Sequence, residues 1–193
     1  MKKIVFGLVF ITSMCYARVD YFRLYGDIFA FLPAFAGIYT LVEQDYEGLA
    51  YLGIATASTL ATAFAIKYSL ASLAKSNESI ASISRRPDGS GYGSKYEGFP
   101  SGHTSSAFSA AGFMQRRYGS LWGIPTTMLA TLVGVSRITS QKHTIFQVLA
   151  GAALGYSMGY FITKRRVDIV IDQRQSKAGK VQGYYGLSFG MMF

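Results

Sequence analysis

The chain contains two histidines, His103 and His143, and each lies in a short stretch rich in polar or basic residues. His103 ends the stretch 99–103, and His143 follows Arg137 by six residues. A third stretch, residues 85–87, reads Arg-Arg-Pro. Histidine can act as a nucleophile or a general acid, and arginine presents a planar fork that matches phosphate oxygens. The residue types therefore favour phosphoryl transfer, provided that the fold brings the three stretches together.

The residues before His103 have the pattern of a helix N-terminus. Pro100 and Ser101 precede Gly102, so Ser101 can cap the helix and Gly102 lets a ligand approach the backbone. Free N–H groups at a helix N-terminus attract anions. An ordinary capped helix and interfacial bases would carry the same residues, so no single stretch decides the matter. The use of both histidines favours a phosphate site.

Taken together, the stretches resemble the three-part signature of the type 2 phosphatidic acid phosphatase superfamily, which also includes vanadium haloperoxidases. That signature reads K-x-x-x-x-x-x-R-P, then P-S-G-H, then S-R-x-x-x-x-x-H-x-x-x-D. Residues 100–103 match the second part in full, and Ser136, Arg137 and His143 match the third part at the right spacing. The resemblance covers roughly residues 50–160.

The resemblance implies a role for each matched residue. His143 would be the nucleophile that forms a phosphohistidine, and His103 would protonate the leaving group. The residues that would hold the phosphate are Arg86, Arg137, Ser101 and Gly102. Such enzymes need no metal or other cofactor for phosphatase work, and the sequence has no clustered carboxylates or Cys/His ligand spacing.

One departure from the signature concerns its lysine. The lysine should lie seven residues before Arg86, where this chain has Ser79, whereas Lys75 lies eleven residues before it. Offsets of seven and eleven return to nearly the same face of an α-helix, which has about 3.6 residues per turn. Lys75 is therefore expected to contact phosphate if residues 75–85 are helical.

The other departure is Gln147, which stands in place of the signature aspartate, four residues after His143. Its amide oxygen can accept a hydrogen bond from Nδ1–H of His143, but a neutral amide cannot stabilise an imidazolium as a carboxylate does. Exchanging the aspartate of a serine-protease triad for an amide costs about 10⁴ in rate. The enzyme is then slower, uses another acid, or has lost catalysis.

These residues favour a membrane lipid phosphatase with its active site at the periplasmic face of a bacterial inner membrane. The resemblance supplies three candidate substrates, namely lipid A phosphate, undecaprenyl diphosphate and phosphatidylglycerol phosphate. The alternative is a catalytically weakened relative that binds phosphorylated lipids without turnover. A haloperoxidase is not expected, because those relatives are mostly larger and soluble. Nucleic-acid binding is not expected, because no basic helix or aromatic platform is present. The oligomeric state stays open.

The elements that must position these residues are apolar. Of the 193 residues, 50% are hydrophobic and only 15% are charged, while the net charge is +9. This composition excludes a disordered chain, and the lone Cys15 excludes a disulfide scaffold. The apolar segments are 24–42, 49–66, 103–114, 121–135 and 145–162. They predict an all-α, polytopic membrane helix bundle with five or six spanning helices, which forms the phosphatase domain over residues 18–166.

The two ends differ from this domain. Residues 1–17 have a charged start, an apolar stretch and a small residue at a plausible cleavage point, which is typical of a signal peptide or a first membrane helix. The C-terminal tail, residues 167–193, has the apolar alternation of strands. With Lys2 and Lys3 inside, loops 67–101 and 136–144 lie outside. Basic residues then number 10 inside and 9 outside, which gives the positive-inside rule little weight.

Overall fold

The computed structural model describes residues 20–91 and 93–166, and these residues form helices joined by turns and loops, with no strand among them. The all-α prediction is therefore confirmed. The helices are α2 (Tyr21–Phe29), α3 (Leu32–Val42), α4 (Tyr46–Leu73), α5 (Glu78–Ala81), the 3₁₀ turn η1 (Ser82–Ser84), α6 (Gly102–Tyr118), α7 (Ser120–Thr139) and α8 (Ile145–Ile162). The predictions for residues 1–17 and 167–193 lie outside the described residues.

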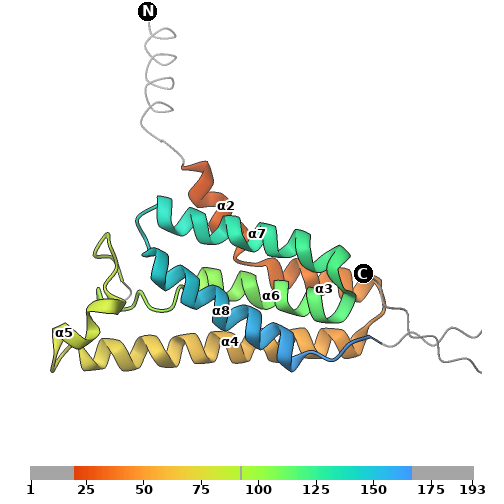
Figure 1. Ribbon diagram of the computed structural model, residues 1–193, viewed down its shortest axis with the longest axis horizontal. Helices are drawn as coiled ribbons and strands as arrows, with labels where there is room; N and C mark the ends of the chain where they lie inside the picture. Colours follow the sequence, from red (N-terminus) through yellow and green to blue (C-terminus); the bar gives the residue numbers. More distant parts are fainter. Residues whose placement is uncertain (1–19, 92, 167–193) are drawn as a thin grey trace, which may run out of the picture.

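Three described helices, α4, α7 and α8, are long and apolar enough to cross a membrane, and α2 with α3 would make a fourth span bent by 49°. The sequence prediction of five or six spans also included residues 1–17, which are not described, and segment 103–114. That segment lies in α6, a 17-residue helix packed against α3, α4, α7 and α8 (Figure 1). Because neighbouring helices cover α6, its buried positions are mostly serine, alanine and glycine rather than large apolar residues.

Small residues bring α6 and α8 into backbone contact. Gly155 of α8 faces the carbonyl of Ser105, so that a Cβ at position 155 would lie 2.1 Å from that oxygen. Gly159 faces the carbonyl of Ser109 in the same way, also at 2.1 Å. Four-residue spacing places these glycines on one face of α8. This close approach holds α8 side by side with α6, the two helices whose N-terminal ends carry the histidine stretches.

Replacement of Gly155 by alanine is expected to destabilise the bundle by about 1–3 kcal/mol, because the added methyl group must push α8 away from α6. The measurement is the apparent melting temperature of the detergent-solubilised protein. Gly53 provides the matched control, since it lies in α4 and a Cβ added there would have nothing within 4 Å. Gly53→Ala should leave the melting temperature unchanged or raise it. Equal melting temperatures for the two variants would contradict this account of the α6–α8 contact.

A buried ion pair secures the end of the bundle remote from the histidines. Asp45, the N-cap residue of α4, accepts hydrogen bonds from Arg117 of α6 and, at 2.8 Å, from the hydroxyl of Tyr118. The hydrogen bond from Arg117 lowers the pKa of Asp45 to about 2. The pair therefore stays ionised at physiological pH, and it ties the start of α4 to the end of α6.

Candidate functional site

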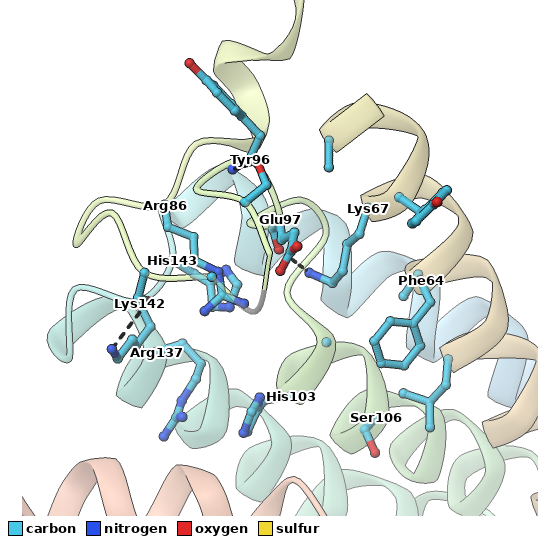
Figure 2. A pocket seen from close by; sticks show the side chains of 18 of the residues that line it. Phe64, Lys67, Arg86, Tyr96, Glu97, His103, Ser106, Arg137, Lys142 and His143 are labelled. Carbon is cyan, nitrogen blue, oxygen red and sulfur yellow. Dashed lines mark hydrogen bonds between the residues drawn. The ribbon is translucent and has the colours of Figure 1, made fainter. Parts of the chain in front are cut away.

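The three histidine- and arginine-bearing stretches meet at one end of the bundle. At this end α4 and α7 finish, α6 and α8 begin, and the connection through α5 folds over them (Figure 1). The stretches border an open cavity of about 1750 Å³. Its lining includes four of the predicted site residues, Arg86, His103, Arg137 and His143, whose side chains surround a shared space (Figure 2). The fold thus places these four residues around one cavity, while their catalytic and binding roles stay predictions.

His143 lies in the loop between α7 and α8 with its imidazole almost wholly buried, and its Nδ1 is 3.1 Å from Oε1 of Gln147. The partners of Gln147 fix how its amide is turned. The backbone N–H of Thr144 donates to Oε1 at 3.2 Å, and Nε2 donates to the carbonyls of Ile83 and Arg85 at 2.9 and 3.0 Å. Because Oε1 can only accept, Nδ1 of His143 must carry the proton. Nε2 of His143 then bears a free lone pair.

Burial lowers the pKa of His143 to about 3, and the nearby cations Lys67 and Arg86 add to this effect. The imidazole is therefore neutral at physiological pH. A neutral imidazole with a defined tautomer is the form in which histidine acts as a nucleophile. Gln147 thus fills the hydrogen-bonding part of the aspartate role in the signature, although it supplies no charge.

Arg86 and Arg137 provide positive charge beside His143 in the cavity (Figure 2). The Nε atom of Arg86 is buried and has no hydrogen-bond partner among the described residues. Arg137 uses three of its five N–H groups on protein atoms, namely Oγ of Ser136, Oδ1 of Asp27 and the carbonyl of Arg23. Unused guanidinium donors remain on both arginines, as an anion site requires.

Comparison of the sequence with known proteins identifies its family. The sequence model of the PAP2 superfamily matches residues 48–170. The chain belongs to the PAP2 superfamily. A lipid A 4'-phosphatase of Helicobacter pylori is 35% identical over 140 residues, covering 72% of this chain and 68% of the relative. A lipid A 1-phosphatase of the same organism is 29% identical over 143 residues, covering 72% of this chain and 69% of the relative.

A lipid A 1-phosphatase of Porphyromonas gingivalis is 37% identical over 84 residues, which are 40% of this chain and 18% of the relative. No solved structure matches the chain significantly. Membership of the PAP2 superfamily and the relatives together make this chain a membrane lipid phosphatase whose substrate is a phosphorylated lipid.

The lysine of this PAP2 phosphatase is placed differently from the sequence prediction. Residues 74–76 form a turn and α5 follows, so residues 75–85 are not one continuous helix, and Lys75 is exposed at the rim of the cavity. Lys67, 19 residues before Arg86, is instead buried. It extends from α4 toward the site and donates to the carbonyl of Glu97 at 2.8 Å (Figure 2). Sequence spacing did not indicate Lys67, because the connection from α4 to Arg86 is irregular.

Replacement of Lys67 by methionine is expected to lower kcat/KM for phosphate release about 10²-fold, because a cation near developing negative charge stabilises the transition state. Methionine keeps most of the apolar stem, so the fold should persist. Lys75→Met removes the same charge from the rim and should change kcat/KM by no more than about twofold. A large loss at position 75 with none at position 67 would instead make Lys75 the lysine that contacts phosphate.

Ser101 and Gly102 also differ in their placement. Ser101 is fully buried at the N-cap position of α6, and its hydroxyl accepts a hydrogen bond from Oγ1 of Thr104 at 3.0 Å rather than capping a backbone N–H. Its backbone N–H donates to the carbonyl of Gln147 at 3.0 Å. Gly102 does line the cavity, close to Lys67. Of Ser101 and Gly102, only Gly102 is thus placed to contact a ligand in the cavity.

Sequence reasoning missed Asp27, the acidic residue that interrupts the apolar segment 24–42. Its Oδ1 accepts a hydrogen bond from Nη1 of Arg137 at 2.6 Å and lies 3.3 Å from Nε2 of His103. Asp27 comes from α2, which precedes the region matched by the superfamily model. Within the described part of the chain, no three His, Cys, Asp or Glu side chains are grouped so that they could hold a metal ion.

Proposed function

We propose that this phosphatase hydrolyses a phosphate monoester of lipid A through a phosphohistidine intermediate at His143. The observation that carries the proposal is the contact of Nδ1 of His143 with Oε1 of Gln147, which leaves Nε2 as the nucleophilic nitrogen of a residue that lines the cavity together with Lys67, Arg86 and Arg137. This combination supplies a nucleophile together with the cations that a phosphoryl group needs.

The reaction has two steps. In the first, Nε2 of His143 forms a bond to phosphorus, the bond from phosphorus to the ester oxygen breaks, and His103 donates a proton to the leaving alcohol. In the second, water attacks phosphorus while His103 takes up its proton, and the phosphorus–nitrogen bond breaks. Inorganic phosphate is released and both histidines return to their starting states. One residue can serve as acid and then base because the two steps are complementary.

The cavity itself supports a lipid substrate. From the charged end it continues between α4 and the α2–α3 pair, where its lining is largely apolar and includes Phe31, Ala34, Leu60 and Phe64. Such a shape suits a phosphorylated headgroup with attached acyl chains. The 4'-phosphate is the first candidate position, because the lipid A 4'-phosphatase relative is 35% identical over most of this chain.

We also place the site at the periplasmic face of an inner membrane. The end of the bundle opposite the site carries the exposed or partly exposed bases Arg116, Lys164, Arg165 and Arg166, as expected of a cytoplasmic end. The site end also carries exposed bases, namely Arg23, Lys75, Arg85 and Lys95, so the proposed orientation rests on the N-terminal Lys2 and Lys3 rather than on a difference in loop charge.

The test is phosphate release by the purified chain from mixed micelles that contain lipid A, undecaprenyl diphosphate or phosphatidylglycerol phosphate. We expect release from lipid A, with mass spectrometry showing loss of the 4'-phosphate. Release only from another of the three lipids would overturn the lipid A assignment. Binding of all three without release would favour the alternative of a weakened, lipid-binding relative, which the replacement of the signature aspartate by Gln147 motivates.

A further inference from the structure

Gln147 contacts two parts of the site at once. Its Oε1 accepts from Nδ1 of His143 at 3.1 Å, while its Nε2 donates to the carbonyls of Ile83 and Arg85 at 2.9 and 3.0 Å. Those two carbonyls belong to the segment directly before Arg86. The side chain that orients His143 therefore also holds the part of the loop that carries Arg86.

The surroundings of the Gln147 amide leave it little freedom. The side chain is fully buried, and a Cβ on Gly98 would lie 2.7 Å from Nε2 and 2.8 Å from Oε1. Gln147 and Thr144 also form a capping box at the start of α8, in which each side chain bonds to the other residue's backbone N–H. The amide is thus anchored on its own helix and enclosed by the loop from Ile83 to Gly98.

Among the described residues, two other side-chain contacts join this loop to the region around His143, namely the ion pair of Asp88 with Lys142 and the stacking of Phe99 on Phe146, and neither contacts Arg85 or Arg86 itself. The backbone N–H of Arg86 donates to the carbonyl of Lys95 at 2.9 Å, and Gly98 donates to the carbonyl of Ser84 at 2.7 Å, but both bonds lie within the loop. The two bonds from Nε2 connect the loop to the helix that positions His143. A carboxylate cannot make these bonds, because an ionised carboxylate has no donor. Aspartate is also one methylene shorter.

We propose that Gln147 is a positioning residue that couples the orientation of His143 to the placement of Arg86, and that it requires an amide. The proposal rests on the proposed function for its kinetic consequence, although the coupling itself is structural. It links the two departures from the superfamily signature. The connection between Lys67 and Arg86 is long and irregular, and the amide donor of Gln147 holds the segment before Arg86 in place.

The experiment compares Gln147→Glu and Gln147→Asp with the native chain. We expect both variants to lower kcat/KM about tenfold or more, although aspartate is the residue of the signature, because buried carbonyls lose their donors. Protonated glutamate can again donate to a carbonyl, so the Gln147→Glu variant should recover toward the native rate as the pH falls. Gln141→Glu, which adds the same charge to the exposed part of the α7–α8 loop, should leave the rate unchanged.

Limited proteolysis with trypsin provides a measurement that does not depend on turnover. We expect cleavage after Arg85 to be several times faster in Gln147→Glu and Gln147→Asp than in the native chain and in Gln141→Glu. Native rates of cleavage in both Gln147 variants would overturn the coupling. A rate of phosphate release in Gln147→Asp equal to or above the native rate would also overturn it. If the native chain releases no phosphate, the proposed function fails, and the cleavage rates still decide the coupling.

Discussion

A chain in which His143 is replaced by asparagine is expected to lose phosphate release by a factor of about 10⁴ or more, since no other group can form the covalent intermediate. The reason lies in the position of Nε2, the free nitrogen of a buried imidazole whose Nδ1 proton is held by Gln147. Asparagine keeps a polar side chain at this position, so the loop between α7 and α8 should retain its fold.

Two measurements check this expectation. Acid-labile, alkali-stable protein phosphate should form in the native chain during turnover and be missing from His143→Asn. The variant should still bind the lipid, because Arg86 and Arg137 remain. Binding is measured as retention of the lipid by the variant in mixed micelles. Phosphate release by His143→Asn at a tenth of the native rate would show that another residue is the nucleophile.

The pH dependence follows from the same environment. Because burial lowers the pKa of His143 from its usual value of 6.5 to about 3, the nucleophile stays unprotonated throughout the physiological range. Protonation of His143 should therefore not limit kcat/KM near pH 5. The low pKa instead reduces the stability of the folded chain in acid. Below about pH 6.5 the unfolded chain binds a proton at His143 and the folded chain does not, which favours the unfolded state. The melting temperature should fall as the pH drops below that value, and less so in His143→Asn.

The sequence predicted those parts of the site that are separated by a single turn or a short loop. His103 follows Gly102 within the first turn of α6, and His143 lies six residues after Arg137 across the short α7–α8 loop. In such cases local geometry fixes the distance between side chains. The helical character of the chain could also be predicted, because long apolar segments in a membrane must satisfy their backbone hydrogen bonds internally.

The remaining parts depend on contacts that spacing does not define. Lys67 and Arg86 are separated by a turn, a short helix and a 3₁₀ turn, so helical periodicity cannot relate them. The carbonyls that bind Gln147 lie 62 and 64 residues before it in the sequence. The capping box of Thr144 and Gln147 was visible as a T-x-x-Q pattern, which offers a second reason for glutamine at this position.

Asp27 is another site residue that sequence spacing could not indicate, and its replacement is expected to have a large effect on activity. It reaches the site only because α2 packs closely on the end of α7. A Cβ on Gly26 would lie 1.8 Å from Oγ of Ser136 and 2.2 Å from Nη2 of Arg137, so no larger residue fits there. That approach brings the Asp27 carboxylate to Arg137 and to His103, the residue proposed as the general acid.

The charge of Asp27 should matter most for His103, which lies in the first turn of α6 and outside the candidate spans. Burial and the nearby Arg137 lower the pKa of His103, and Asp27 opposes this effect. Without the carboxylate, the pKa of His103 falls further, and less of the acid is protonated at a given pH. A carboxylate that accepts from His103 also limits how its ring can turn.

Replacement of Asp27 by asparagine is therefore expected to lower kcat about 10²-fold, which is within the usual contribution of general acid catalysis. The alkaline limb of the kcat profile should move to lower pH, because the acid loses its proton earlier. Asp20→Asn is the matched control, since Asp20 caps the same helix through its bond to the N–H of Arg23 at 3.0 Å and does not line the cavity. Removal of that charge should leave the kcat profile in place. If Asp27→Asn lowers only the melting temperature and leaves kcat and its pH profile unchanged, Asp27 acts in packing alone and His103 is oriented by other contacts.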